Sequence, residues 1–317
     1  MADKMSENKR NTALYSIVIP VFRSEGVVSE TAQRVLTFMR SNNLHVELIL
    51  VNDGSPDRSW EIIHKLAQEN KEVVAINLLK NYGQHTAVYC GIRESKGDFV
   101  ITMDDDLQNP PEELIKLINK IAEGYDLVFG QFHQKMHAGV RKLGTRVIAH
   151  LNAQIFGKPK EIKLTNFRIF TRDTAQRLLS YKTNYPYIPG LLLLHASNMA
   201  NVETEHHARL IGDSNYTLWR IIKLVSRLLF NYSSYPLKIA SSVGTSISVL
   251  SFLLGLFFIF KALVIGSSVE GWTTIVVLVS FLSGFIIVMI GIIGEYLARI
   301  MNQLASDVPY QIREKIE

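Results

Sequence analysis

The chain has 317 residues, which is enough for one large domain or for a domain with an appendage. Charged residues make up 20% and hydrophobic residues 47% of the sequence, and the formal net charge is +5 with a mean hydropathy of +0.12. This mild basic excess suits an anionic membrane surface or phosphorylated ligands, and because no RNA- or DNA-reading motif is present we exclude nucleic acid as a partner. A single cysteine, Cys90, excludes an intramolecular disulfide and fits a reducing compartment.

The first part of the chain has the pattern of an α/β domain. Residues 1–14 are polar and lack the apolar core of a signal peptide, so we expect a flexible N-terminus. From residue 15 to about 130, apolar runs rich in β-branched residues alternate with amphipathic helical stretches. The expected strands read YSIVIPV, VELILVN, VVAINLL, DFVITM and YDLVFG. Strands that alternate with helices pair in parallel, so the pattern predicts a mostly parallel sheet.

Polar clusters follow the ends of three predicted strands, where parallel sheets gather their ligands. They read PVFRSE, NDGSPD and DDDLQ in chain order. Adjacent carboxylates in the third cluster repel one another, and a bound cation would offset that repulsion. Asp104, Asp106 and Gln108 can project to the same side of an extended segment, and oxygen ligands of this kind suit Mg²⁺ or Mn²⁺. A solvated acidic turn that caps the helix at Pro110 is the alternative.

The other two clusters contain groups suited to a nucleoside. Asp53 can accept hydrogen bonds from a base or a ribose, and Gly54 lets the backbone turn tightly beside a ligand. Phe22 could stack on a base, and Glu25 could bind ribose hydroxyls. A plain turn remains the alternative for NDGSPD, and the PVFRSE cluster alone is a weak signal.

Two long apolar runs close the chain, at residues 239–260 and 273–293. Each has about 20 residues without Asp, Glu, Lys or Arg, which is enough to cross a hydrocarbon core of roughly 30 Å. We therefore expect two transmembrane helices within residues 239–294. The lysines and arginines that flank the two spans favour a cytoplasmic large domain and two cytoplasmic termini, in a multi-pass protein of the inner cell membrane.

The segment 216–238 precedes the first span and is too charged to cross a membrane. Its apolar residues share one helical face, whereas Arg220, Lys223 and Arg227 lie elsewhere. This pattern predicts a juxtamembrane amphipathic helix in the headgroup plane, and an ordinary helix packed on the domain is the alternative. Residues 295–317 would then form a cytoplasmic C-terminal tail.

Five stretches of the sequence resemble the family 2 glycosyltransferases that load sugars onto polyprenyl phosphates. They read SIVIPVFRSEG, ILVNDGSPD, NYGQHTAVYCGI, GDFVITMDDDLQNPPEEL and GIIGEYLARI, and together they span nearly the whole chain. The combination of DDDLQNPPE with two C-terminal spans is specific. The resemblance implies a GT-A fold over residues 15–215, which is a Rossmann-like nucleotide-sugar-binding domain with an Asp-x-Asp metal motif.

The resemblance also implies donor and metal ligands at the strand ends. Residues that would hold the nucleoside are Pro20, Phe22, Glu25 and Asp53. Asp104 and Asp106 would form the Asp-x-Asp pair, and Asp104 and Asp105 would also contact the donor. Asp106 and Gln108 would be the direct ligands of a Mg²⁺ or Mn²⁺ ion that bridges the donor diphosphate.

Phosphate-binding residues implied by the resemblance lie later in the chain. Arg209 and Ser214, in RLIGDSNY, would contact the donor diphosphate. Arg141 in a basic helix and Arg168 in NFRIF would handle donor and acceptor phosphates, and for Arg141 a basic face resting on anionic lipid is the alternative. With the Asp-x-Asp pair, these three arginines are the predicted catalytic residues.

Two positions depart from the family pattern. The segment 163–166, KLTN, stands where relatives often carry an acidic residue and a Gly, so an Asp sometimes proposed as a base is absent. Asn215 stands where a Lys is common. The missing base matters little, because a phosphate monoester has a second pKa near 6 and is largely deprotonated at neutral pH. For His85, in NYGQHT, we expect a structural role in ordering its loop.

These patterns predict an inverting, divalent-metal-dependent glycosyltransferase of the cell envelope. It would move a sugar, with a UDP-hexose as the expected donor, to undecaprenyl phosphate in the lipid bilayer, and a homo-oligomer and a separate flippase are further expected partners. A processive polysaccharide synthase is one alternative, but the nearest string to its Gln-x-x-Arg-Trp motif is Leu218-Trp219-Arg220, in the wrong order. A non-catalytic nucleotide-sugar-binding membrane module is the other.

Overall fold

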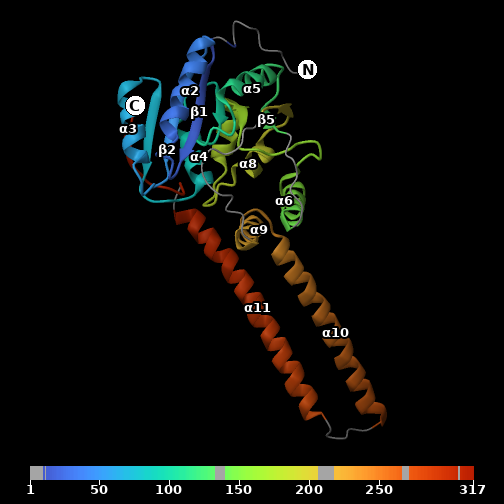
Figure 1. Ribbon diagram of the computed structural model, residues 1–317. Helices are drawn as coiled ribbons and strands as arrows, with labels where there is room; N and C mark the ends of the chain where they lie inside the picture. The colour runs from blue at the N-terminus through green and yellow to red at the C-terminus, as the bar shows by residue number, and fades with distance from the viewer. Residues whose placement is uncertain (1–9, 11, 133–139, 206–217, 266–270, 306–307) are drawn as a thin grey trace. The chain divides into compact units, whose positions relative to one another are not determined.

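A computed structural model describes residues 10, 12–132, 140–205, 218–265, 271–305 and 308–317 (Figure 1). These residues form two compact units. The first unit comprises Met1–Ile221 with Asp307–Glu317, and the second comprises Ile222–Ser306. The first unit contains the sheet and all of the predicted nucleotide-binding clusters, whereas the second contains the long C-terminal helices.

An eight-stranded sheet forms the centre of the first unit, in the order β7-β5-β6-β4-β1-β2-β3-β8. The strands are β1 (Leu14–Val21), β2 (His45–Asn52), β3 (Val73–Leu78), β4 (Phe99–Thr102), β5 (Leu127–Gln131), β6 (Arg168–Thr171), β7 (Met199–Glu203) and β8 (Ile312–Ile316). The neighbours β4, β1, β2 and β3 pair in parallel, and β5 pairs in parallel with β7. This arrangement confirms the predicted α/β fold with a mostly parallel sheet.

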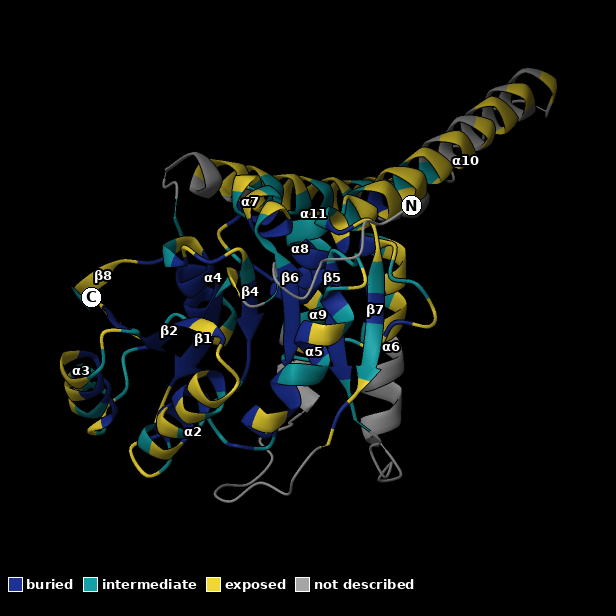
Figure 2. Ribbon diagram, turned by 90° about the horizontal axis from the view of Figure 1, so that it is seen from above, coloured by how far each residue is buried: buried dark blue, intermediate teal, exposed yellow. Residues whose placement is uncertain are grey.

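Three of these strands, β6, β7 and β8, lie outside the five that the sequence predicts. β6 is antiparallel to both of its neighbours and separates β5 from β4. β8 is antiparallel to β3 and forms the opposite edge of the sheet. Figure 2 shows that the central strands are buried, whereas β8 is largely exposed.

Helices cover both faces of the sheet, with α4 (Gln84–Glu94), α7 (Arg172–Ser180) and α8 (Ile188–His195) on one side (Figure 2). On the other side lie α2 (Val28–Ser41), α3 (Ser59–Glu69) and α5 (Leu114–Ile121), the last preceded by the short helix η1 (Pro111–Glu113). The basic helix α6 (Val140–Phe156) precedes β6 in the chain. Helices on both faces leave the edge formed by the strand ends as the place for a ligand.

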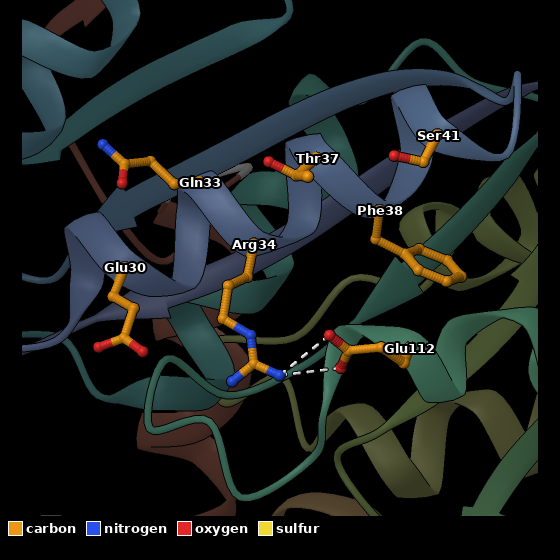
Figure 3. A pocket seen from close by; sticks show the side chains of 7 residues that line it. All are labelled: Glu30, Gln33, Arg34, Thr37, Phe38, Ser41 and Glu112. Carbon is orange, nitrogen blue, oxygen red and sulfur yellow. Dashed lines mark hydrogen bonds and ion pairs between the residues drawn. The ribbon is translucent and has the colours of Figure 1, made fainter.

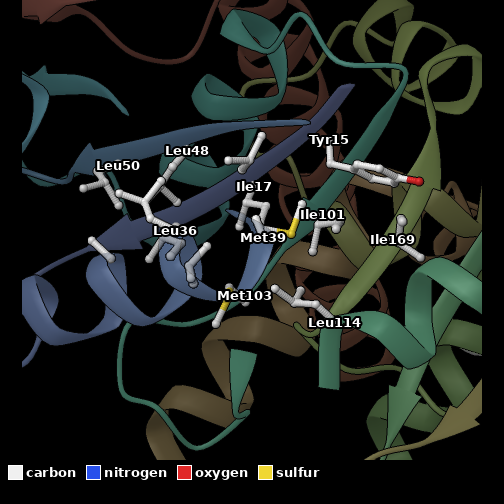
Figure 4. Close-up of a cluster of buried hydrophobic side chains, with 14 of the residues drawn as sticks. Tyr15, Ile17, Leu36, Met39, Leu48, Leu50, Ile101, Met103, Leu114 and Ile169 are labelled. Carbon is white, nitrogen blue, oxygen red and sulfur yellow. The ribbon is translucent and has the colours of Figure 1, made fainter. Parts of the chain in front are cut away.

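The main core lies between the sheet and α2, α3 and α5. Alternate residues of β1, namely Tyr15, Ile17 and Ile19, all belong to it. Figure 4 labels Tyr15 and Ile17 within this core. From α2 it takes one helical face, which is Val28, Ala32, Val35, Leu36 and Met39. Burying each large aliphatic side chain of this kind stabilises the fold by about 1.5–3 kcal/mol, so the core can hold the strand ends in fixed register.

The second unit is helical and contains most of α9 (Leu218–Tyr232), together with α10 (Tyr235–Ile265) and α11 (Trp272–Ala305). Tyr296 of α11 donates a hydrogen bond from its hydroxyl to the backbone oxygen of Ser233, at 3.0 Å. Within the described ranges, one stretch, Phe281–Ala298 of α11, is long and apolar enough to cross a membrane. Residues 239–260 lie in α10, and the prediction that they form a second span stays a prediction.

The last residues of the chain belong to the first unit. The expected tail, residues 295–317, contains the end of α11 and then β8. Leu79, just after β3, donates its backbone N–H to the oxygen of Gln311 at 2.9 Å and accepts from the Arg313 guanidinium at 3.0 Å. Lys315 pairs with Glu94 of α4 at 2.8 Å. The segment that follows the long helices is therefore a structural part of the sheet.

Candidate active site

The loops after β1, β2, β3 and β4 meet at one edge of the sheet because these four strands are parallel. All three predicted polar clusters lie at the ends of β1, β2 and β4 or in the loops that follow them. The Arg23 backbone N–H donates to Ser55 Oγ at 3.1 Å, which joins the first loop to the second. The Ser24 backbone N–H donates to Ser59 Oγ at 3.0 Å, which joins the first loop to α3.

The Asp53 carboxylate holds the loop that follows β3. Its Oδ1 accepts from the Tyr82 backbone N–H at 2.7 Å, and its Oδ2 accepts from the Gly83 N–H at 2.8 Å. Asp53 is 2% exposed, and burial raises the pKa of its carboxyl while the two amides oppose that rise. At Gly54 the backbone has φ +61°, and a Cβ would lie 2.5 Å from the carbonyl carbon of Lys80. The loops after β2 and β3 can therefore approach this closely only at a glycine. The contact of Asp53 with a nucleoside stays a prediction.

The first cluster presents one exposed aromatic ring. Phe22 is 42% exposed, and the Arg23 guanidinium lies 5.5 Å from the centre of its ring. The Glu25 carboxylate accepts from the Arg58 backbone N–H at 3.0 Å, just before α3 begins. Pro20 lies inside β1 and is buried. Of these residues, Phe22 has the surface that stacking on a base requires.

The three adjacent aspartates turn to different partners. Asp105 accepts a hydrogen bond from Ser24 Oγ, and its backbone oxygen accepts from Thr31 Oγ1 at 2.8 Å. Burial, helped by the charges of Asp104 and Asp106, raises the pKa of the Asp105 carboxyl to about 7, against the Ser24 hydrogen bond. Asp105 thus fastens the loop after β4 to the loop after β1 and to α2, and its predicted contact with the donor stays a prediction.

Asp104 lies between two side-chain amides from distant parts of the chain. Gln84, the first residue of α4, donates from Nε2 to Asp104 Oδ1 at 2.6 Å. Asn166, in the loop before β6, donates from Nδ2 to Oδ2 at 3.2 Å and to Oδ1 at 3.4 Å. We call this arrangement the amide clamp, and it consists of Gln84, Asn166 and the Asp104 carboxylate.

Asp106 forms a local turn. Its Oδ1 accepts from the Gln108 backbone N–H at 3.2 Å, and Leu107 has φ +56°. This left-handed residue interrupts the extended backbone on which the expected convergence of Asp104, Asp106 and Gln108 rested. Among the residues that the structure describes, no group of three or more His, Cys, Asp or Glu side chains is placed to hold a metal ion.

The donor set nevertheless fits a hard divalent ion. Asp104, Asp106 and Gln108 are all partly exposed and follow one strand end. They offer carboxylate and amide oxygens, which Mg²⁺ and Mn²⁺ prefer. Mg²⁺ is commonly held by only one or two carboxylates, with water and substrate phosphates as its other ligands, so two protein carboxylates suffice here.

Arg168 begins β6 and is 1% exposed. Its Nε donates to Thr102 Oγ1 at 3.0 Å, and that hydroxyl donates to the backbone oxygen of Asn166 at 2.7 Å. In the described part of the structure, Nη1 of Arg168 is buried without a hydrogen-bond partner. Burial lowers the pKa of the guanidinium to about 10, and the charge of Asp104 opposes that shift. A buried cation with a spare donor is suited to an anionic oxygen.

His85 and Tyr187 lie beside this arginine. Their rings meet edge to face, with centroids 5.2 Å apart. Burial lowers the pKa of His85 to about 4, with a further contribution from the charge of Arg168, so the imidazole is neutral at neutral pH. The Tyr187 hydroxyl accepts from Asn152 of α6 at 3.3 Å. These contacts agree with a structural role for His85 in its loop.

Three predicted phosphate ligands cannot be placed at the site. Arg209 and Ser214 lie outside the described residues, as does Asn215. Arg141 lies in α6, but the structure does not describe its side chain. Their roles stay predictions.

Two residues of the clamp were not predicted as site residues. Gln84 lies in NYGQHT, which follows the end of a predicted strand, so the rule that placed the other clusters at this edge could also have found it. Asn166 drew attention only as a departure from a family pattern. Neutral amides give no charge signal in a sequence, and their partners become visible only in the fold.

A separate hollow of about 400 Å³ opens along the outer side of α2 (Figure 3). Its lining residues are Glu30, Gln33, Arg34, Thr37, Phe38, Ser41 and Glu112. Arg34 binds both carboxylate oxygens of Glu112, at 3.0 and 2.9 Å, and both side chains are substantially exposed. None of the predicted site residues lines this hollow, so we do not assign the chemistry to it.

Comparison with known proteins identifies the family. A family model described as "Glycosyl transferase family 2" matches residues 16–182, just over half of the chain. The chain belongs to glycosyltransferase family 2. The matched residues contain the clusters after β1, β2 and β4, the clamp residues Gln84 and Asn166, and Arg168.

Relatives and solved structures agree with that assignment. Undecaprenyl-phosphate 4-deoxy-4-formamido-L-arabinose transferase of Proteus mirabilis (strain HI4320) is 32% identical to this glycosyltransferase, over 95% of this chain and 93% of the relative. An uncharacterized glycosyltransferase of Bacillus subtilis (strain 168), YkcC, is 31% identical over 95% of this chain and 93% of that protein.

Glucosyl-3-phosphoglycerate synthase from Mycobacterium tuberculosis, in complex with Mn²⁺, uridine diphosphate and phosphoglyceric acid, superposes with a TM-score of 0.52. It is 17% identical, and the match covers 72% of this chain and 82% of that chain. The likeness confirms the expected GT-A fold of this glycosyltransferase.

Proposed function

We propose that this glycosyltransferase moves a sugar from a nucleotide donor, most simply a UDP-hexose, to undecaprenyl phosphate at the cytoplasmic face of the cell membrane. Nearly full-length similarity to transferases whose names include undecaprenyl phosphate supports the lipid-phosphate acceptor. The observation that carries the proposal is the placement of Arg168, buried and with a spare Nη1 donor in the described structure, beside Asp104 at the strand-end edge.

The reaction is a single displacement at the anomeric carbon. An oxygen of the acceptor phosphate forms a bond to that carbon, the bond from carbon to the donor diphosphate breaks, and the nucleoside diphosphate leaves with the electron pair. Attack from the face opposite the leaving group inverts the anomeric configuration. The acceptor phosphate has a second pKa near 6 and is mostly dianionic at neutral pH, so it needs no protein base. Asn166, in place of an acidic residue, is compatible with that chemistry.

Two anionic groups must approach each other in this reaction, and the arginines would offset their repulsion. Arg168 would hold an acceptor or leaving-group oxygen through Nη1. Arg141, Arg209 and Ser214 would supply further phosphate contacts. Phe22 would stack on the base, with Pro20, Glu25 and Asp53 completing the nucleoside site.

Asp104, Asp106 and Gln108 would hold the Mg²⁺ or Mn²⁺ ion, with Asp105 contributing to donor binding. When bound, such an ion neutralises charge on the departing diphosphate. The Mn²⁺ and uridine diphosphate named in the complex of the Mycobacterium tuberculosis synthase support a divalent ion for this fold.

We place the chain in the inner membrane as a multi-pass protein. Phe281–Ala298 supports a span in α11, and residues 239–260 of α10 would form the other span. α9 would lie as an amphipathic helix in the headgroup plane, and the catalytic domain and both termini would face the cytoplasm. A homo-oligomer and a separate flippase would complete the system.

Product analysis tests the proposed function. The full chain in nanodiscs would be incubated with undecaprenyl phosphate, Mn²⁺ and a panel of UDP-, GDP- and dTDP-sugars, and the lipids would be examined by mass spectrometry. We expect one undecaprenyl phosphosugar, formed from a UDP-hexose, that is lost when the divalent ion is chelated. A water-soluble polymer would instead favour a processive synthase, and nucleotide binding without turnover across the panel would favour a non-catalytic module.

A further inference from the structure

We infer that Gln84 and Asn166 are positioning residues, which orient the Asp104 carboxylate toward the divalent ion through the amide clamp. The inference rests on the proposed function, since it gives a purpose to the contacts around the Asp-x-Asp motif. Neither residue is expected to touch the sugar. Their effect would pass through Asp104.

The clamp is anchored on two rigid elements. Gln84 is the first residue of α4, and the residue before it, Gly83, is fixed by its hydrogen bond to Asp53 at 2.8 Å. Asn166 lies two residues before β6, which is paired on both of its sides. Donors on two separate elements approach both oxygens of one carboxylate, at 2.6 and 3.2 Å. This geometry restricts the rotation of the Asp104 side chain more than one donor could.

The neutrality of both donors is the second part of the argument. An ammonium or guanidinium group in the same place would cancel the charge that a cation needs. An amide orients a carboxylate and leaves its charge in place, and an ionised carboxylate can accept about four hydrogen bonds or metal bonds. An acidic residue at position 166 would instead put a second negative charge within hydrogen-bonding distance of Asp104, and like charges so close are unfavourable. Asn166 is therefore matched to Asp104 in this chain.

The clamp is also joined to the phosphate-binding side of the site. The backbone oxygen of Asn166 accepts from Thr102 Oγ1 at 2.7 Å, and the same hydroxyl accepts from Arg168 Nε at 3.0 Å. This short hydrogen-bond network fixes the Asp104 carboxylate, which suits the cation, relative to the Arg168 guanidinium, which suits the anion. Attack by one phosphate and departure of the donor diphosphate require that separation to be held constant.

Mn²⁺ binding tests the clamp without relying on turnover. Gln84→Met and Asn166→Leu remove each donor with little change in volume, and Gln33→Met, on the exposed side of α2, is the matched control. The signal of free Mn²⁺ in electron paramagnetic resonance would be titrated with the full chain in nanodiscs and excess UDP. We expect each clamp variant to weaken Mn²⁺ binding by about tenfold, with the thermal midpoint within about 3 °C of wild type. The control should bind as wild type does.

The expected pattern extends to two further variants. Asp104→Ala should weaken Mn²⁺ binding. Adding Gln84→Met to Asp104→Ala should weaken Mn²⁺ binding no further, because the clamp acts through the Asp104 carboxylate. Asn166→Asp also removes the amide donor but adds a negative charge that a cation would offset, so it is compared with Asn166→Leu for sugar transfer. A gain of transfer activity in Asn166→Asp would show that an acidic residue here serves as a base, and would overturn the inference.

Other outcomes separate the clamp from the proposed function. Loss of thermal stability with unchanged Mn²⁺ affinity would leave the two amides a purely structural role and overturn the inference. A wild-type protein that bound no Mn²⁺ would overturn it as well. The protein could also transfer no sugar to undecaprenyl phosphate while both clamp variants still weaken Mn²⁺ binding. That result would support the role of the amide clamp and reject undecaprenyl phosphate as the acceptor.

Discussion

Arg168 donates a hydrogen bond to the hydroxyl of Thr102 at 3.0 Å, although only 1% of this arginine is exposed. Removing a cation from water is costly, and the pKa of this guanidinium, lowered to about 10 by burial, reflects that cost. A buried charge without a full ion pair is poor evidence for stability. Under the proposed function, its Nη1 atom, unpartnered in the described structure, would bind a phosphate oxygen beside Asp104.

Arg168→Met should therefore separate activity from stability. Replacing a buried charge by an apolar side chain of similar length is often neutral or stabilising, so we expect the thermal midpoint to stay or to rise. Sugar transfer to undecaprenyl phosphate should fall by about 100-fold or more, because a donor to the developing charge is lost. Arg34→Met, which removes a largely exposed ion pair with Glu112, is the control and should change neither quantity by much. Activity near that of wild type in Arg168→Met would contradict the role given to this residue.

Two glycines in neighbouring loops provide a matched pair of variants whose stabilities can be compared. Gly54 and Gly83 have φ values of +61° and +97°, so an L residue is strained at both. At Gly54 a Cβ would also lie 2.5 Å from the backbone carbonyl carbon of Lys80, whereas at Gly83 nothing lies within 4 Å of it. We expect Gly54→Ala to lower the free energy of unfolding by about 1–3 kcal/mol more than Gly83→Ala does. Equal thermal midpoints for the two variants would show that the loops separate freely.

His85 should make stability depend on pH. Its pKa is lowered from 6.5 to about 4 by burial and by the charge of Arg168. The unfolded chain therefore binds a proton between these values that the folded chain does not. The stability from a neutral His85 is fully present above about pH 6.5 and is lost as the pH falls through about 4, by at most about 3 kcal/mol.

Thermal midpoints across this range check the prediction. The fall in midpoint from about pH 7 to about pH 5 should be smaller in His85→Gln than in wild type. His45→Gln, at an exposed histidine that begins β2, should keep the wild-type slope. An unchanged slope in His85→Gln would mean that this imidazole is already protonated in the fold.

The C-terminal strand should protect the only cysteine in the sequence. Cys90 is fully buried, and burial raises the pKa of its thiol to about 12. Tyr310, just before β8, is 6% exposed and lies against Tyr89, with ring centroids 6.5 Å apart. We expect slow maleimide labelling of wild type and labelling at least about tenfold faster after removal of residues 308–317 or in Tyr310→Ala.

Lys315→Met is the control for that experiment, because it removes the ion pair with Glu94 and leaves the strand in place. Its labelling should stay slow. Labelling of the truncated chain at the wild-type rate would show that β8 does not cover this part of the sheet.

Local periodicity made much of the fold predictable. The buried face of α2, including Val28, Val35 and Met39, follows from helical spacing alone, and so does that of α5, which buries Leu114 and Leu117. The clusters at the strand ends could be placed because parallel strands deliver their carboxyl ends to one edge. β6 and β8 could not be predicted, because they have only four and five residues and are specified by pairing with strands distant in the sequence. The Arg313-Glu314-Lys315 run in β8 even has the charges typical of an exposed edge.

The sequence predicted the position of the acidic run in the fold but not its contacts. The acidic run lies where the sequence places it, yet its three carboxylates do not act alike: Asp105 binds Ser24, and Asp104 binds Gln84 and Asn166. These choices depend on the left-handed backbone at Leu107 and on loops far apart in sequence. Pattern and spacing carry neither kind of information.

A structure of the full chain with Mn²⁺ and UDP would test the central claim most directly. We predict that the ion contacts the Asp104 and Asp106 side chains, that the uracil ring stacks on Phe22, and that the diphosphate faces Arg168. An ion and a nucleotide bound away from residues 104–108, with the aspartates left as a solvated turn, would contradict the assignment of this edge as the catalytic centre.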